Sequence, residues 1–161
     1  MFCIVSILDY NKFNLKIGRY SMRKGPLTLG DTFTVQKLVE EEDTSLNYGS
    51  GELEKLFATP SLIALMIKAS VELIDPTLEE GFISVGKSSW VIHDKPTILG
   101  ETVSVKVTIK ELESARIFLE MEAYDEIGVI SRGTHERYII NKDSFFKYIK
   151  ERAKRLESKD F

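Results

Sequence analysis

A threonine and a histidine, each at the end of a predicted element, are the strongest candidates for chemistry in this sequence. Thr59 stands before Pro60 and a long apolar run, a pattern typical of a helix start. The free amides and the dipole at such a start favour developing negative charge, so a hydroxyl there could orient or activate a nucleophile. The plainer interpretation is that Thr59 only caps the helix.

His93 is the second candidate, because it ends an apolar stretch and precedes Asp94-Lys-Pro96. An ordinary histidine pKa of about 6.5 suits it to act as a base or charge stabiliser near neutral pH. Strand ends often carry functional residues. The alternative is a solvated histidine at a strand exit.

A glycine and an arginine could contact a substrate. Gly86 lies inside a predicted strand, where it lets a carbonyl approach the backbone amide or marks a bulge. Arg137 could bind a phosphate or carboxylate with its two-pronged guanidinium. It shares a strand face with His135, and the alternative for both is a surface strand with cross-strand ion pairs, which we prefer for His135.

The elements that must position these residues follow from the hydrophobic periodicity. A long helix from Thr59 to Ile74 has its polar residues Ser61, Lys68 and Glu72 on one narrow stripe, which predicts burial on nearly every other side. Period-two alternation and turn residues predict strands elsewhere. The predicted strands are Asp31 to Glu42, Gly81 to Asp94, Glu101 to Lys110, Ala115 to Tyr124 and Ile127 to Asn141.

This order predicts an α+β fold in which neighbouring antiparallel strands wrap around the one long helix. A final amphipathic helix is predicted over 143–157, with Phe145, Ile149, Ala153 and Leu156 on one face. We assign 22–161 to this domain. Residues 1–21 precede Met22 and are either an appended segment or an artefact of the start site.

Composition restricts the partners. The 161 residues carry a net charge of −3, without the excess of Lys and Arg that a nucleic-acid-binding protein needs. One Cys and two His exclude a cysteine zinc site and a three-histidine centre within one chain, and we expect neither a metal nor a cofactor. We find no membrane-spanning run and no signal peptide, so we expect a cytosolic protein.

Three segments in the expected order carry a family resemblance: FATPSLIALM (57–66), SVGKSSWVIH (84–93) and GTHER (133–137). They resemble the hotdog-fold thioesterases related to fluoroacetyl-CoA thioesterase, over roughly residues 22–150. The resemblance implies a hotdog fold and cleavage of an acyl thioester at a dimer interface. It assigns catalytic roles to Thr59 and His93, a backbone amide to Gly86, and a place near the substrate to Arg137.

One position departs from the family pattern. The catalytic glutamate of the family falls eight residues after the threonine, and here that residue is Ile67, which we interpret as a packed helix residue. Substitute carboxylates are conceivable in the sequence but none stands out: Glu72, Asp94, Asp43 and Glu52 to Glu54. An aromatic lid is expected near residues 47–53, where Tyr48 could serve in part. Ser50 and Leu53 replace ring residues, which speaks against fluoroacetyl selectivity.

The sequence therefore predicts a homodimeric acyl-CoA thioester hydrolase with an incomplete catalytic set; a tetramer stays open. The alternative is a non-catalytic protein that binds acyl-CoA or a similar small ligand, and Ile67 favours it because an apolar residue extends an acyl pocket at the cost of chemistry. A dehydratase or hydratase is a third, weaker reading, since the same fold hosts those activities.

Overall fold

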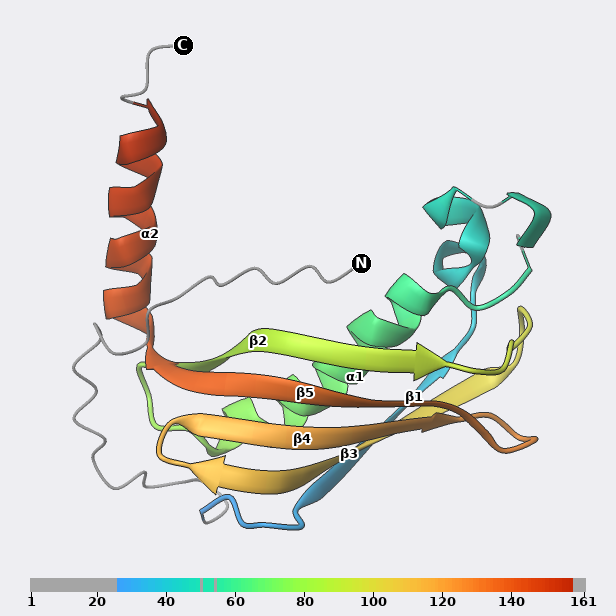
Figure 1. Cartoon of the computed structure of the whole chain (residues 1–161), viewed down its shortest axis with the longest axis horizontal. Coiled ribbons are helices and arrows are strands. Elements are labelled where there is room, and N and C mark those ends of the chain that lie inside the picture. Colours follow the sequence, from blue (N-terminus) through green and yellow to red (C-terminus); the bar gives the residue numbers. More distant parts are fainter. Residues whose placement is uncertain (1–25, 50, 54, 158–161) are drawn as a thin grey trace.

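A single antiparallel sheet and one long helix make up the body of the computed structural model, which describes residues 26–157 apart from residues 50 and 54 (Figure 1). The strands run in the spatial order β1-β3-β4-β5-β2, and every neighbouring pair is antiparallel. Their bounds are Thr32–Leu38 (β1), Phe82–His93 (β2), Thr102–Glu113 (β3), Arg116–Tyr124 (β4) and Val129–Asn141 (β5).

Helix α1, Thr59–Ile74, lies across one face of this sheet (Figure 1). The alternating residues of the central strands point to that face, as their period of two predicts. Together with the buried side of α1 they form one apolar core. Its most deeply buried members are Leu62, Met66, Ala69, Ile74, Val103, Val105, Val107, Ile109, Ile117, Leu119, Met121 and Ala123. The predicted α+β hotdog arrangement is confirmed.

Burial of α1 differs from the prediction. The helix was expected to be buried on nearly every side, but Ile67 is 36% exposed and Ala64 is also exposed. The reason is that one chain supplies a sheet on only one side of the helix. Conversely, Ser70 is fully buried, where its hydroxyl donates to the carbonyl of Met66 at 2.9 Å.

Strand β2 forms one edge of the sheet, and among the described residues it pairs only with β5. Its register shifts between Gly86 and Ser88, which is a β-bulge. Residues 86–90 are exposed in succession, and Trp90 is 57% exposed. The backbone groups on the outer side of this edge strand have no strand beside them among the described residues.

Residues 41–53 and a C-terminal helix lie outside the sheet and α1. Residues 41–53 contain three short 3-10 helices, Glu41–Asp43, Ser45–Tyr48 and Gly51–Leu53, so the first predicted strand ends earlier than expected, at Leu38. Helix α2, Lys142–Glu157, follows β5 and stands out from the end of the sheet (Figure 1). The predicted appendage 1–21 lies outside the described residues. No helix among the described residues is long and apolar enough to cross a membrane.

Candidate active site

Thr59 and His93 meet where α1 begins and β2 ends. The Thr59 Oγ1 lies 3.0 Å from Nδ1 of His93, within hydrogen-bond distance. Thr59 is the first residue of α1 and Ala58 occupies the cap position, so Pro60 is the second helical residue rather than the first. The capping role considered for Thr59 is therefore wrong, because its hydroxyl is directed to the histidine.

The His93 ring is half-buried. The edge of Phe57 packs against it, with ring centroids 6.4 Å apart and planes at 74°. Burial lowers the pKa of His93, against the opposing effects of the Lys95 backbone and the Asp94 charge. The imidazole is therefore neutral at pH 7, which is the form that can accept a proton. Its Nε2 is buried and has no hydrogen-bond partner among the described residues.

Tyr48 reaches the same end of α1 from the 41–53 segment. Its hydroxyl accepts a hydrogen bond from Ser61 Oγ at 3.3 Å, two residues along the helix from Thr59. The segment is held there by backbone bonds, among them the amide of Ala58 to the carbonyl of Asp43 at 2.9 Å. Tyr48 is 51% exposed, so it borders the Thr59–His93 pair without sealing it.

No carboxylate of the described residues hydrogen-bonds to His93. Asp43 instead pairs with Lys37 at 3.1 Å, and Glu72 pairs with Lys68 at 3.8 Å. Ile67 lies on the exposed side of α1, so the interpretation of Ile67 as a packed residue is wrong. A carboxylate at position 67 would stand on the surface of this chain, on the side of α1 that the chain's own sheet leaves uncovered.

Gly86 and Arg137 lie together, away from Thr59 and His93. They are register partners on β2 and β5, and Gly86 is seven residues before His93, about 23 Å along a strand. A Cβ at position 86 would come within 3.0 Å of His135 Cε1. A larger residue at position 86 would therefore press against the His135 ring.

The interpretation of His135 and Arg137 as a surface strand is wrong, since they are only 2% and 3% exposed. They lie on the inner face of the sheet. Arg137 donates from Nε to Ser84 Oγ at 2.9 Å and from Nη2 to the Ser84 carbonyl at 2.8 Å. Ser84 Oγ in turn donates to Asp75. Burial lowers the pKa of Arg137, and the charge of Asp75 opposes this.

Sequence reasoning missed Ser84 and Asp75 as parts of this cluster. Asp75 directly follows the predicted helix and precedes Pro76, a position that by itself marks only a helix end. The register of β2 against β5 reveals the cluster, because it places Ser84 and Gly86 beside the Arg137 side chain on one face of the sheet. That register is not visible in either strand alone. The predicted substrate contact of Arg137 stays a prediction.

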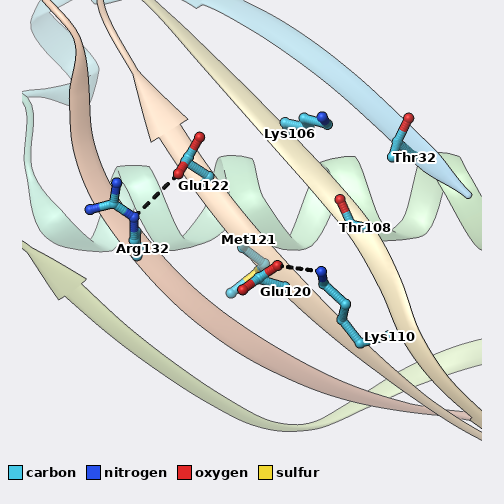
Figure 2. Close-up of a pocket in the computed structure, with 8 residues that line it drawn as sticks. All are labelled: Thr32, Lys106, Thr108, Lys110, Glu120, Met121, Glu122 and Arg132. Carbon is cyan, nitrogen blue, oxygen red and sulfur yellow. Dashed lines mark ion pairs between the residues drawn. The ribbon is translucent and has the colours of Figure 1, made fainter. Parts of the chain in front are cut away.

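A shallow pocket of about 310 Å³ lies on the opposite face of the sheet, away from α1 (Figure 2). Four of its charged side chains pair across strands: Lys110 with Glu120 at 2.8 Å, and Arg132 with Glu122 at 3.2 Å. These are solvated pairs on an exposed face. Within the described part of the chain, no three His, Cys, Asp or Glu side chains converge in a way that could hold a metal.

A family model described as fluoroacetyl-CoA-specific thioesterase matches residues 39–143. The chain belongs to the fluoroacetyl-CoA-specific thioesterase family. The fluoroacetyl-CoA thioesterase of Streptantibioticus cattleyicolor is 35% identical over 94 residues, which are 58% of this chain and 68% of that protein.

Solved structures of the family and of the wider fold agree. A hot-dog-like protein from Thermanaerovibrio acidaminovorans is 32% identical, with a TM-score of 0.74 over 90% of this chain and 97% of that one. The fluoroacetyl-CoA thioesterase FlK is 30% identical, with a TM-score of 0.71 over 79% of this chain and 98% of that one. Helix α2 begins at Lys142, so nearly all of it lies beyond the region matched by the family model.

Proposed function

We propose that this member of the thioesterase family hydrolyses acyl-CoA thioesters, with Thr59 and His93 as its reacting pair. The observation that carries the proposal is the 3.0 Å contact between the Thr59 hydroxyl and Nδ1 of a half-buried His93. A neutral imidazole beside a hydroxyl at a helix start is able to activate an oxygen nucleophile.

The reaction needs only water and the thioester. Thr59 orients a water molecule, and His93 takes a proton from it as the water oxygen bonds to the carbonyl carbon. Collapse of this adduct breaks the C–S bond, and the proton passes to the departing sulfur. The products are a carboxylic acid and the free thiol of coenzyme A. A backbone amide at Gly86 stabilises the carbonyl oxygen as its negative charge develops.

The site is completed by a second copy. An edge strand pairs isologously with its copy around a twofold axis, which sets the Phe82 end of one β2 opposite the His93 end of the other. Gly86 then lies nearer to the partner's His93 than to its own, so each thioester binds between subunits. A tetramer and the cytosolic location expected from the sequence stay predictions.

The absence of a carboxylate at position 67 makes the hydrolysis slow. Without a carboxylate partner, nothing fixes the imidazole tautomer or stabilises the imidazolium that forms. Loss of such a partner commonly lowers the rate by orders of magnitude and leaves the contribution of binding and oxyanion contacts.

The same position supports a second candidate function, a non-catalytic protein that binds acyl-CoA. Ile67 presents an apolar surface of 36% exposure on α1, which suits an acyl chain better than it suits proton transfer. Both functions predict that coenzyme A, or a non-hydrolysable thioether analogue of acyl-CoA, raises the melting temperature. Only the hydrolase releases free thiol.

The test is an assay of thiol release over a panel of acyl-CoA substrates, with wild type and His93→Ala compared. We expect measurable turnover in wild type, loss of that turnover in His93→Ala, and an unchanged thermal shift with coenzyme A in both proteins. A matched control is Ser61→Ala, whose hydroxyl bonds Tyr48 and not His93. Turnover that persists in His93→Ala would show that His93 takes no part in the mechanism. A thermal shift with coenzyme A but no turnover in wild type would support the non-catalytic binding function instead.

A further inference from the structure

Helix α2 carries an apolar face that the sheet does not cover. At 100° per residue its large apolar side chains fall within one arc. Phe146 is 45% exposed, Ile149 40% and Leu156 61%, while Phe145 packs edge-on against Phe146 with centroids 6.2 Å apart. The sequence of α2 contains six basic and three acidic residues, so the helix is positively charged.

The segment over the site entrance is acidic and exposes apolar side chains, so it complements the basic, partly apolar helix α2. We call residues 40–53 the entrance segment. This segment includes five acidic residues and no basic one. Among the described residues, Glu41 and Glu52 form no ion pair, whereas Lys37 lies within 4 Å of Glu40, Glu42 and Asp43. The entrance segment also exposes large apolar side chains: Leu46 (55%), Tyr48 (51%) and Leu53 (49%).

The two surfaces cannot easily meet within one chain, because they lie at opposite ends of β2 (Figure 1). Asn141, the last residue of β5, pairs with Phe82 at the start of β2, and Lys142 at the start of α2 donates to the carbonyl of Gly81 at 2.9 Å. The entrance segment instead lies over Thr59 and His93, at the other end of β2.

A twofold dimer through β2 brings them together. Antiparallel pairing of β2 with its copy sets the Phe82 end, and therefore the root of α2, opposite the partner's His93 end. With its 16 residues, α2 is about 24 Å long, enough to extend over the neighbouring entrance segment. This step rests on the dimer of the proposed function.

We propose that α2 of each subunit docks on the entrance segment of its partner and closes the partner's acyl site. The apolar arc of α2 covers the exposed leucines and tyrosine, and its basic flanks face the acidic residues. The helix thereby supplies the outer wall that Tyr48 alone leaves open. A closed, water-poor site favours acyl groups that are apolar at their far end.

A disulfide cross-link tests the contact without any need for catalysis. In a Cys3→Ser background, one tagged chain carries Ile149→Cys and a second, differently tagged chain carries Leu46→Cys. The two full-length chains are co-expressed, purified through both tags and oxidised. We expect a cross-linked band of twice the chain mass on a non-reducing gel. The matched control is Lys147→Cys in place of Ile149→Cys, since position 147 lies about 160° round the helix.

Several results would overturn the proposal. These are equal linking from position 147, or an intact dimer by light scattering with no link at all. A third is a link within one chain when a single chain carries both Leu46→Cys and Ile149→Cys, with no link in the two-chain dimer. If Cys3 is retained and links to Ile149→Cys instead, the N-terminal segment covers α2. If wild type sediments with phosphatidylserine vesicles and Ile149→Glu does not, α2 binds membranes rather than its partner.

Mixed dimers then show whose site is closed. One dimer pairs wild type with a chain carrying both His93→Ala and Ile149→Glu, and the other pairs His93→Ala with Ile149→Glu on separate chains. Closure in trans predicts a raised KM only in the first dimer, where the damaged helix faces the functional histidine. Closure in cis predicts the reverse. If no dimer shows any turnover, the proposed hydrolase function is wrong. The cross-linking experiment still tests whether α2 docks on the partner, because it does not depend on activity.

Discussion

The Nε2 atom of His135 lies 3.1 Å from Nη1 of Arg137, and both side chains are almost completely buried. Because a guanidinium only donates, His135 Nε2 is the acceptor and the ring proton lies on Nδ1. That nitrogen donates to the Ser88 carbonyl at 2.8 Å and lies 2.6 Å from Ser89 Oγ. His135 is thus a fixed, neutral imidazole that ties β5 to the bulge of β2, not a second base.

Protonation of His135 should destabilise the fold. Burial, with help from the Arg137 charge, lowers its pKa to about 4, whereas the unfolded value is near 6.5. The unfolded chain therefore binds more protons between these values. The free energy of unfolding therefore has its full value above about pH 6.5. It decreases by on the order of 3 kcal/mol as the pH falls toward 4.

Urea unfolding at pH 7 and pH 5, at one protein concentration, measures this loss. His93, whose pKa is also lowered, adds to the slope in wild type. The comparison is therefore between wild type and His135→Gln, which retains His93. We expect a smaller difference between the two pH values in the variant, and an unchanged difference would show that His135 is not the titrating group.

Ser84→Ala should weaken the buried cluster. The hydroxyl of Ser84 accepts from Arg137 Nε at 2.9 Å, and its removal leaves that charged donor buried and unsatisfied. The expected cost is about 1–3 kcal/mol in the free energy of unfolding. Ser88→Ala is the control on the same strand, because Ser88 is exposed and contributes its carbonyl, so its cost should stay within about 0.5 kcal/mol. Equal costs would contradict the cluster.

A double-mutant cycle should couple Gly86 to His135. Gly86→Ala brings a methyl group to 3.0 Å from His135 Cε1, and such overpacking costs about 1–3 kcal/mol. In a His135→Ala background the ring is gone, so the same substitution should cost close to nothing. Unfolding free energies of the four proteins give the coupling. Additive costs would mean that glycine is required at position 86 for another reason.

Ile67→Glu should restore the missing carboxylate. The position is 36% exposed, so the unfolding free energy should change by less than about 1 kcal/mol. Hydrolysis of acyl-CoA should rise on the order of 10²-fold if the carboxylate enters the chemistry. Ile67→Gln, with the same shape and no charge, is the control. A rise in neither variant would place the reacting groups away from this side of α1.

The order and type of the elements could be predicted from the sequence because they depend on local patterns. Alternation through Val103, Val105 and Val107 identified β3, and the apolar run after Pro60 identified α1. The three quoted segments then led to the family and to Thr59 and His93 as candidate catalytic residues, whereas their contact is seen only in the structure. These are properties of neighbouring residues, or of the order of short motifs along the chain.

The buried cluster could not be predicted, because it depends on register. His135 and Arg137 alternate with Glu136 and Tyr138, so both faces of β5 contain polar residues and the inner face is not marked. Their burial is stabilised by Ser84 and Asp75, more than 50 positions earlier in the chain. The exposure of Ile67 was missed for a related reason, since a hydrophobic pattern does not show which side of a helix the chain's own sheet leaves uncovered.

The most direct test of the central claim is a kinetic cycle on Thr59 and His93. The measurement is kcat/KM for thiol release from one acyl-CoA with wild type, Thr59→Val, His93→Ala and the double variant. If the 3.0 Å contact joins one catalytic unit, the double variant loses no more activity than the worse single variant. Losses that multiply, or a Thr59→Val variant as active as wild type, would contradict the account.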